Sequence, residues 1–172
     1  MPARKAKPDA RLTHLNARGE MHMVDIAGKA VTRRTATASA IFQADARTIR
    51  ALVSGGGKKG DALAAARLAG ILAAKRTPDL IPLAHPLALT RVEIAILPEG
   101  KTALQILATC ETDGKTGVEM EALCAAAAAA LTLYDMGKAM NRGALIRSIR
   151  LEHKAGGKSG EYRREAVRKS RK

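Results

Sequence analysis

The chain has 172 residues and a mass of 18.1 kDa, which fits one domain that buries roughly 70% of its unfolded surface on folding. Hydrophobic residues make up 47% and charged residues 27%, and these values exclude a disordered polyelectrolyte and a membrane protein. The net charge of +14 points to an anionic partner.

The positive charge is concentrated at the two ends of the chain. Residues 1–11 carry four basic and one acidic side chain, and residues 162–172 carry six and one. We therefore expect a basic flexible N-terminal tail at 1–11, a domain at 12–161 and a basic flexible C-terminal tail at 162–172. The domain itself is only modestly basic, which suits a polyphosphate pocket. A basic nucleic-acid-binding protein is the alternative, although the chain has few aromatic residues on which bases could stack.

The predicted elements begin with a strand of small and β-branched residues at 35–42, followed by a helix from residue 45 to about 53. The sequence GGGKKGD at 55–61 is too rich in glycine for a regular element. Its last residue, Asp61, is a suitable N-cap for an Ala- and Leu-rich helix that runs to about Lys75.

The second half of the chain continues with a segment at 78–86 in which prolines interrupt the helix. Residues 88–97 and 102–111 alternate with period two around a PEGK turn, which predicts an antiparallel hairpin. A long helix follows from about 117 to 141, and 144–153 alternates again.

This order of elements is βαββαβ with one additional helix. It predicts an α+β fold, a ferredoxin-like sandwich with an antiparallel sheet. No apolar run reaches the length of about 20 residues that a membrane helix needs, and no secretory signal is visible. We therefore expect a cytoplasmic protein.

Two glycine-rich loops carry lysines and are candidates for binding phosphate. Residues 54–61, SGGGKKGD, precede a helix N-terminus, but neither they nor the loop at 153–160 match the P-loop pattern. In the second loop Lys154 and Lys158 are the candidate ligands. Flexible connectors with solvated lysines have the same composition, so both interpretations stay open.

His85 lies between Pro82 and Pro86 in LIPLAHP, a stiff segment that could aim the imidazole, although a plain surface or core histidine is the alternative. The four histidines form no HxxxH or Cys/His cluster, so no metal site is expected. Cys110 and Cys124 are not a CxxC pair and are expected to be small buried residues.

The long helix carries Glu119, Glu121, Asp135 and Lys138. The two glutamates cannot both face one pocket if the segment is fully helical, whereas Asp135 and Lys138 are i,i+3 neighbours that could form a simple surface ion pair. Glu121 and Asp135 lie within roughly 40° of the same helix face but ~21 Å apart along the axis. If both line active sites, each site combines groups from two subunits.

Six segments together resemble the cyclic pyranopterin monophosphate synthase family of molybdenum cofactor biosynthesis. They are LTHLN (12–16), MHMVDIAGKA (21–30), KGDALAAARLAGILAAKRTPDLIPLAHPL (59–87), GKTGVEMEAL (114–123), LTLYDMGKAM (131–140) and KAGGKSGEY (154–162).

The resemblance implies a lyase that converts 3′,8-cyclo-7,8-dihydroguanosine 5′-triphosphate to cyclic pyranopterin monophosphate and releases diphosphate. A radical S-adenosylmethionine GTP cyclase would supply the substrate. The resemblance also implies a homohexamer, a trimer of dimers, with active sites at subunit interfaces. It implies no required cofactor, although Mg²⁺ could accompany the triphosphate, and neither a membrane nor a specific nucleic acid as partner.

The resemblance assigns roles residue by residue. It makes Asp135 the catalytic aspartate and Lys59 and Lys138 the essential lysines. The substrate-binding positions that it implies are Leu83, Ala84, His85, Met120 and Glu121, with Glu119, Arg34, Asp25, Lys154 and Lys158 as further pocket groups.

The sequence departs from the family pattern at two of these motifs. Ala84 stands where many members have Cys, which implies that no thiol chemistry is needed there. Gly137 lies inside the YDM-x-K motif and is expected to weaken the helix by roughly 1 kcal/mol relative to Ala.

Overall fold

The computed structural model describes residues 14–16, 18–55 and 60–165. The predicted βαββαβ order is confirmed, with α1 as the additional helix and α3 and β5 as short elements that the sequence patterns did not reveal. In chain order the elements are β1 (Thr32–Gln43), α1 (Ala46–Val53), α2 (Ala62–Lys75), α3 (Thr77–Leu80), β2 (Arg91–Glu99), β3 (Ala103–Gly114), α4 (Glu119–Gly137), β4 (Leu145–Ala155) and β5 (Tyr162–Arg163).

The strands form one antiparallel sheet in the order β2-β3-β1-β4-β5. β1 pairs with β3 along its whole length, from Thr32 opposite Gly114 to Gln43 opposite Ala103. The hairpin of β2 and β3 lies beside β1, and β4 lies on its other side. This arrangement confirms the ferredoxin-like fold.

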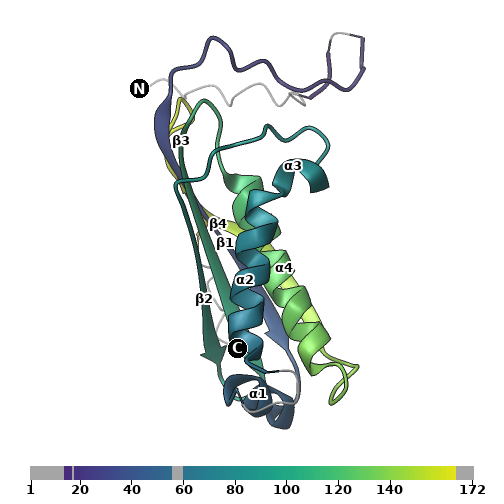
Figure 1. The fold of residues 1–172 in the computed structure, drawn as a ribbon. Coiled ribbons are helices and arrows are strands. Elements are labelled where there is room, and N and C mark those ends of the chain that lie inside the picture. Colours follow the sequence, from purple (N-terminus) through teal and green to yellow (C-terminus); the bar gives the residue numbers. More distant parts are fainter. Residues whose placement is uncertain (1–13, 17, 56–59, 166–172) are drawn as a thin grey trace, which may run out of the picture.

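Helices α2 and α4 cover one face of the sheet (Figure 1). The side chains of β1 that face them, Ala36, Ala38, Ala40 and Phe42, are completely buried. Alanines on α4 form the opposing surface, since Ala122, Ala125, Ala126 and Ala129 are also completely buried. Small side chains on both surfaces allow the long helix to lie close to the sheet.

Aspartate caps fix where the first two helices begin. The Asp45 carboxylate accepts a hydrogen bond from the Thr48 backbone N–H before α1. Asp61 accepts from the N–H groups of Leu63 and Ala64, which confirms it as the predicted N-cap of α2.

Gly137, the last residue of α4, lies against α1. A Cβ atom at this position would be 3.2 Å from Cγ2 of Thr48 and 3.5 Å from a Leu52 methyl group. The glycine therefore allows close contact between the two helices, which the expectation of a weaker helix did not include.

β5 lies in the segment that the sequence analysis assigned to the C-terminal tail. Tyr162 pairs with Lys154 and Arg163 with His153, and the Arg164 N–H donates to the Glu152 carbonyl. A two-residue strand has too few positions to show alternation, so only its pairing with β4 reveals it.

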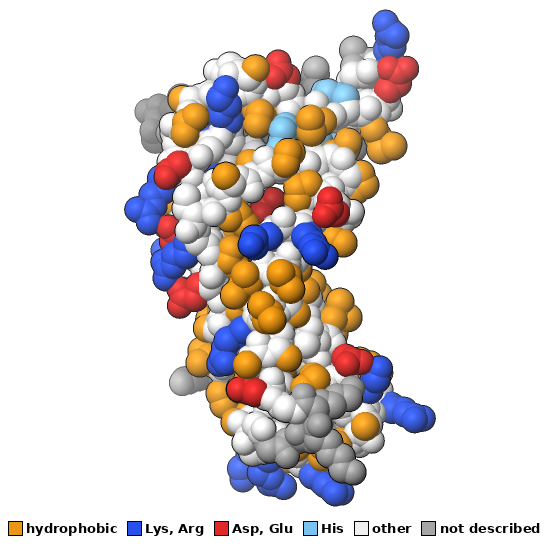
Figure 2. Space-filling view, in the orientation of Figure 1, with side chains coloured by type: hydrophobic (Ala, Val, Ile, Leu, Met, Phe, Trp, Pro, Cys, Tyr) orange, Lys and Arg blue, Asp and Glu red, His pale blue; other side chains and the backbone are white. Residues whose placement is uncertain are grey.

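The outer surface of the helical layer exposes several large apolar side chains. Leu68 and Leu72 on α2 and Leu131 on α4 are 59%, 45% and 61% exposed. Figure 2 shows hydrophobic side chains over the middle of this layer, with separate cationic and acidic side chains around them. We call these three leucines the helical apolar face. Within the described ranges, no helix combines the length and apolar character needed to cross a bilayer.

Candidate active site

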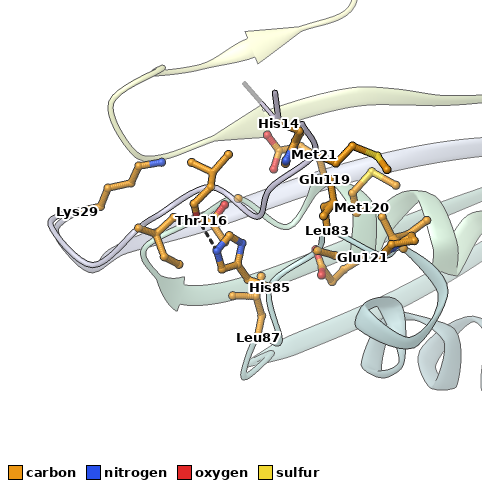
Figure 3. Close-up of a pocket in the computed structure, with 16 residues that line it drawn as sticks. His14, Met21, Lys29, Leu83, His85, Leu87, Thr116, Glu119, Met120 and Glu121 are labelled. Carbon is orange, nitrogen blue, oxygen red and sulfur yellow. Dashed lines mark hydrogen bonds between the residues drawn. The ribbon is translucent and has the colours of Figure 1, made fainter. Parts of the chain in front are cut away.

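A cavity of about 640 Å³ lies where the chain before β1, the segment between α3 and β2 and the first turn of α4 meet. We call it the apolar cavity because aliphatic and thioether side chains form most of its wall. In Figure 3, Met21, Leu83 and Met120 gather on one side of it, and Leu87 lies below His85. The apolar cavity brings together Leu83, Ala84, His85, Glu119, Met120 and Glu121, six of the residues that the resemblance implied.

A second cavity of about 290 Å³ adjoins the first. Five cationic side chains line it, those of Lys29, Arg34, Lys115, Lys154 and Lys158, and we call it the basic cavity. Lys29, Thr116, Gly117 and Glu119 line both cavities, so the two form adjoining parts of one site.

His85 is held by the chain segment that precedes β1. Its Nε2 atom lies 2.9 Å from the Val24 carbonyl oxygen, as the dashed line in Figure 3 marks. Because a carbonyl oxygen only accepts hydrogen bonds, Nε2 carries the hydrogen in this arrangement. Lys115 Nζ donates to the Ala27 carbonyl at 2.7 Å and holds the same segment at a second point. We call residues 18–31 the N-terminal strap.

Arg34 fixes the turn between β3 and α4. Its Nε donates to the Gly114 carbonyl at 2.8 Å and its Nη2 to the Lys115 carbonyl at 3.1 Å. This turn carries Lys115, Thr116 and Gly117, which line the cavities. Arg34 therefore shapes the basic cavity as well as contributing charge to it.

Glu121 is the most buried carboxyl group of the site, with 3% of the residue exposed. Burial raises the pKa of the Glu121 side chain, and the nearby charge of Glu119 raises it further. The group can therefore hold a proton at a higher pH than an ordinary glutamate. An acid placed in an apolar wall is suited to donating or accepting a proton at a bound heterocycle.

Glu119 and Glu121 both line the apolar cavity, contrary to the expectation for a fully helical segment. The helix begins only at Glu119, so no preceding turn restricts the direction of its side chain. Glu119 Oε1 accepts a hydrogen bond of 2.8 Å from Lys154 Nζ, across the boundary with the basic cavity. This ion pair lies between the two parts of the site.

Asp135 and Lys138 lie at the other end of α4. Lys138 Nζ is 2.6 Å from Asp135 Oδ1, and both side chains are about half exposed. The hydrogen bond and charge of Asp135 raise the pKa of Lys138. Because the ammonium is exposed and keeps its hydration, the Asp135 carboxylate dominates over the opposing effect of burial on this pKa. Asp135 is sixteen residues from Glu119, or about 24 Å along the helix.

Asp25, a further expected site residue, does not line either cavity. Asp25 is exposed, and its Oδ1 accepts from the Ala27 N–H at 2.8 Å, which shapes a turn of the N-terminal strap. Lys59 lies outside the described residues.

Lys29 and Lys115 line the basic cavity but were absent from the expected site. Each lies inside one of the segments that carried the resemblance. Lys29 is the second-to-last residue of MHMVDIAGKA, and Lys115 is the second residue of GKTGVEMEAL. Their position within these two segments is the sequence signal for both lysines.

Cys110 is buried in the core, as expected, and burial raises the pKa of its thiol to about 12, whereas Cys124 is only half-buried. Both thiols are free, so neither forms a disulfide. Over residues 14–16, 18–55 and 60–165, no three His, Cys, Asp or Glu side chains gather closely enough to hold a metal ion.

A comparison with known protein families finds a match to the part of the chain that carries the apolar cavity and the basic cavity. The model of the MoaC family matches residues 23–157, well over half of the chain. This range includes both cavities apart from His14 and Met21 of the first and Lys158 and Ser159 of the second. The chain therefore belongs to the MoaC family, the family of cyclic pyranopterin monophosphate synthase, which acts in molybdenum cofactor biosynthesis.

Proposed function

We propose that this protein is a cytoplasmic lyase that converts 3′,8-cyclo-7,8-dihydroguanosine 5′-triphosphate to cyclic pyranopterin monophosphate and diphosphate. The observation that carries the proposal is the junction of an apolar cavity with a basic cavity. A guanine-derived ring system fits the first by its flat apolar faces, and the triphosphate fits the second by its charge.

The basic cavity supports the phosphate chemistry. A ribose oxygen attacks the α-phosphorus, the bond from this phosphorus to the bridging oxygen breaks, and diphosphate leaves with that oxygen. Lys154, Lys158 and Arg34 are placed to stabilise the charge that develops on the leaving group. His85 is a further candidate for contact with the substrate, since it lines the adjoining apolar cavity.

The rearrangement of the ring system requires proton transfers, for which we propose Asp135, Lys138 and Lys59 as catalytic groups. Asp135 and Lys138 lie too far along α4 to reach the cavities of their own chain. We therefore propose that they serve the cavities of a neighbouring copy, in a homohexamer built as a trimer of dimers.

The helical apolar face supports this assembly. Leu68 and Leu72 in α2 and Leu131 in α4 are exposed. A second copy packed there about a twofold axis, with its helices reversed, would bring the Asp135 end of one chain toward the Glu121 end of the other. Burial of leucines removes apolar surface from water and stabilises the dimer.

We propose no resident cofactor for this reaction. A Mg²⁺ ion that arrives with the triphosphate could share the neutralisation of its charge with the lysines. A radical S-adenosylmethionine GTP cyclase is the proposed source of the substrate.

The direct test is to incubate the purified protein with the cyclised guanosine triphosphate and to measure diphosphate and, after oxidation, a fluorescent pterin. Release of both products in equal amounts is the expected result. Diphosphate without a pterin would contradict the proposal.

A mixing experiment tests the shared site. His85→Ala and Asp135→Asn proteins, each impaired alone, should gain activity when their subunits are exchanged, because mixed dimers contain one intact site. For random exchange in twofold dimers the expected recovery is about one quarter of the wild-type rate. No recovery after verified exchange would place the whole site in one chain.

The alternative function is nucleic-acid binding through the basic tails. Removal of residues 1–11 and 166–172 should then abolish a steeply salt-dependent affinity for DNA or RNA. Under the proposed function, removal of residues 1–11 leaves turnover unchanged.

A further inference from the structure

Glu119 is the one carboxylate among the described residues that line the basic cavity. Five cationic side chains surround the same space. Glu119 also lines the apolar cavity, so it lies where the two parts of the site join. A negative charge at this point opposes binding of a polyanion, and its presence requires a physical reason.

Lys154 differs from Arg34 and Lys115 in the kind of group to which it donates a hydrogen bond. Arg34 and Lys115 donate to backbone carbonyl groups, which carry no formal charge. Lys154 Nζ instead donates to Glu119 Oε1 at 2.8 Å and lies 3.4 Å from Ser159 Oγ. Both members of the ion pair are 28% exposed, so water screens their attraction less than it would on an open surface.

We propose that Glu119 is an internal counter-ion that holds Lys154 while the site is empty and competes with diphosphate for it, so that product release is faster. This inference rests on the proposed function for the identity of the anion. Diphosphate breaks the ion pair when it binds, and the pair forms again when diphosphate leaves.

Competition between Glu119 and diphosphate for Lys154 is useful because the triphosphate of the substrate and the diphosphate product present the same phosphate groups to the basic cavity. Cations that bind a triphosphate strongly also retain the diphosphate that it releases, and slow product release limits the turnover of many enzymes. A carboxylate already in contact with Lys154 replaces the lost phosphate contact without leaving a partly buried ammonium unpaired.

The first turn of α4 can receive Glu119 when the ion pair is broken. The helix begins at Glu119, and its N-cap residue, Val118, makes no side-chain capping hydrogen bond. Backbone N–H groups at a helix N-terminus lack partners within the helix and favour a nearby negative charge. The displaced carboxylate therefore has a second favourable position within its own reach.

Calorimetric titration with inorganic diphosphate tests the inference on the intact protein, without catalysis. Glu119→Gln should bind diphosphate about two- to tenfold more tightly than wild type, because the competitor is gone. Lys154→Met should bind it more weakly. In the Lys154→Met background, Glu119→Gln should have little effect, because no ammonium remains to compete for. Glu99→Gln, the same change at the exposed last residue of β2, is the matched control.

Three results would overturn the inference. They are unchanged or weaker diphosphate binding by Glu119→Gln, an equal gain from Glu119→Gln with and without Lys154, and no diphosphate binding by the wild-type protein. Pre-steady-state kinetics give a second readout, since Glu119→Gln should show an initial burst of product followed by a slower rate. A protein that binds diphosphate as expected but forms no pterin would contradict the proposed function and not the role of Glu119.

Discussion

Lys138 Nζ lies 2.6 Å from Asp135 Oδ1 at the last turn of α4. This ion pair is about 24 Å along the helix from Glu119, the first residue of α4, whose carboxylate lines the apolar cavity. Exposed pairs of this kind contribute little to stability, because water competes for both charges. Its value to the protein is therefore expected to be chemical.

The first prediction follows from this pair. Asp135→Asn and Lys138→Met should each lower turnover by about 10²- to 10⁴-fold, the contribution of a well-placed acid or base. The melting temperature and the oligomer size should stay at the wild-type values. Pterin formation measures the first effect, and thermal melting with size-exclusion chromatography measures the second. Glu99→Gln removes another exposed carboxylate as a control, and near-normal turnover of either variant would disprove the assigned roles.

The second prediction concerns the tether between His85 and the N-terminal strap. His85→Ala removes the hydrogen bond to the Val24 carbonyl, so the strap should open more often and exchange its backbone amide hydrogens faster. The KM for substrate should rise because the strap forms part of the cavity wall. Hydrogen exchange with mass spectrometry over residues 18–31 makes the measurement. His153→Ala, on β4, is the control, and equal strap protection in both variants would show that His85 does not hold it.

The third prediction is a pH dependence of stability caused by Glu121. Burial raises the pKa of this carboxyl in the folded protein, so the folded state binds the proton more tightly than the unfolded state does. Stability therefore falls as the pH rises from the unfolded pKa through the raised folded pKa. Glu121→Gln should melt at a higher temperature than wild type at pH 7.

The gain from Glu121→Gln should disappear in acid, below the pKa of an ordinary glutamate, because the wild-type carboxyl is then neutral in both states. Melting curves across this pH range, with Glu99→Gln beside them, measure the effect. A gain that is independent of pH would assign it to packing rather than to the charge of Glu121.

The fourth prediction distinguishes backbone strain from steric overlap at two glycines of the loop after β4. Gly156 and Gly160 both have positive φ, at 100° and 66°. A Cβ at Gly156 would overlap the Arg33 carbonyl oxygen, whereas a Cβ at Gly160 would have no heavy atom within 4 Å among its described surroundings. Gly160→Ala should cost about 1 kcal/mol of unfolding free energy for backbone strain alone.

Gly156→Ala adds the overlap with a backbone atom that cannot rotate away, so its cost should exceed about 2 kcal/mol. It should also weaken diphosphate binding, because Gly156 lines the basic cavity beside Lys154. Chemical denaturation and calorimetry measure the two effects. Equal losses of stability in the two variants would show that the loop moves to avoid the overlap.

The elements of the fold could be predicted because their signals are local. Alternation within 88–97 and 102–111 predicted the hairpin, and Asp61 marked the start of α2, since neighbouring residues determine each of these features. The two-residue strand β5 gave no such signal, because its formation depends on a partner strand.

The family, the order of strands and helices, and six residues that meet in the apolar cavity could all be predicted from motifs and periodicity along the chain. The folded chain alone reveals that Glu119 contacts Lys154, 35 positions away, and that Val24 holds His85, 61 positions away. Such contacts depend on how sheet, helix and strap pack together. Helix geometry alone predicts the separation of Asp135 from the cavities. The exposure of the leucines proposed to pair two chains depends instead on which face of each helix is buried against the sheet.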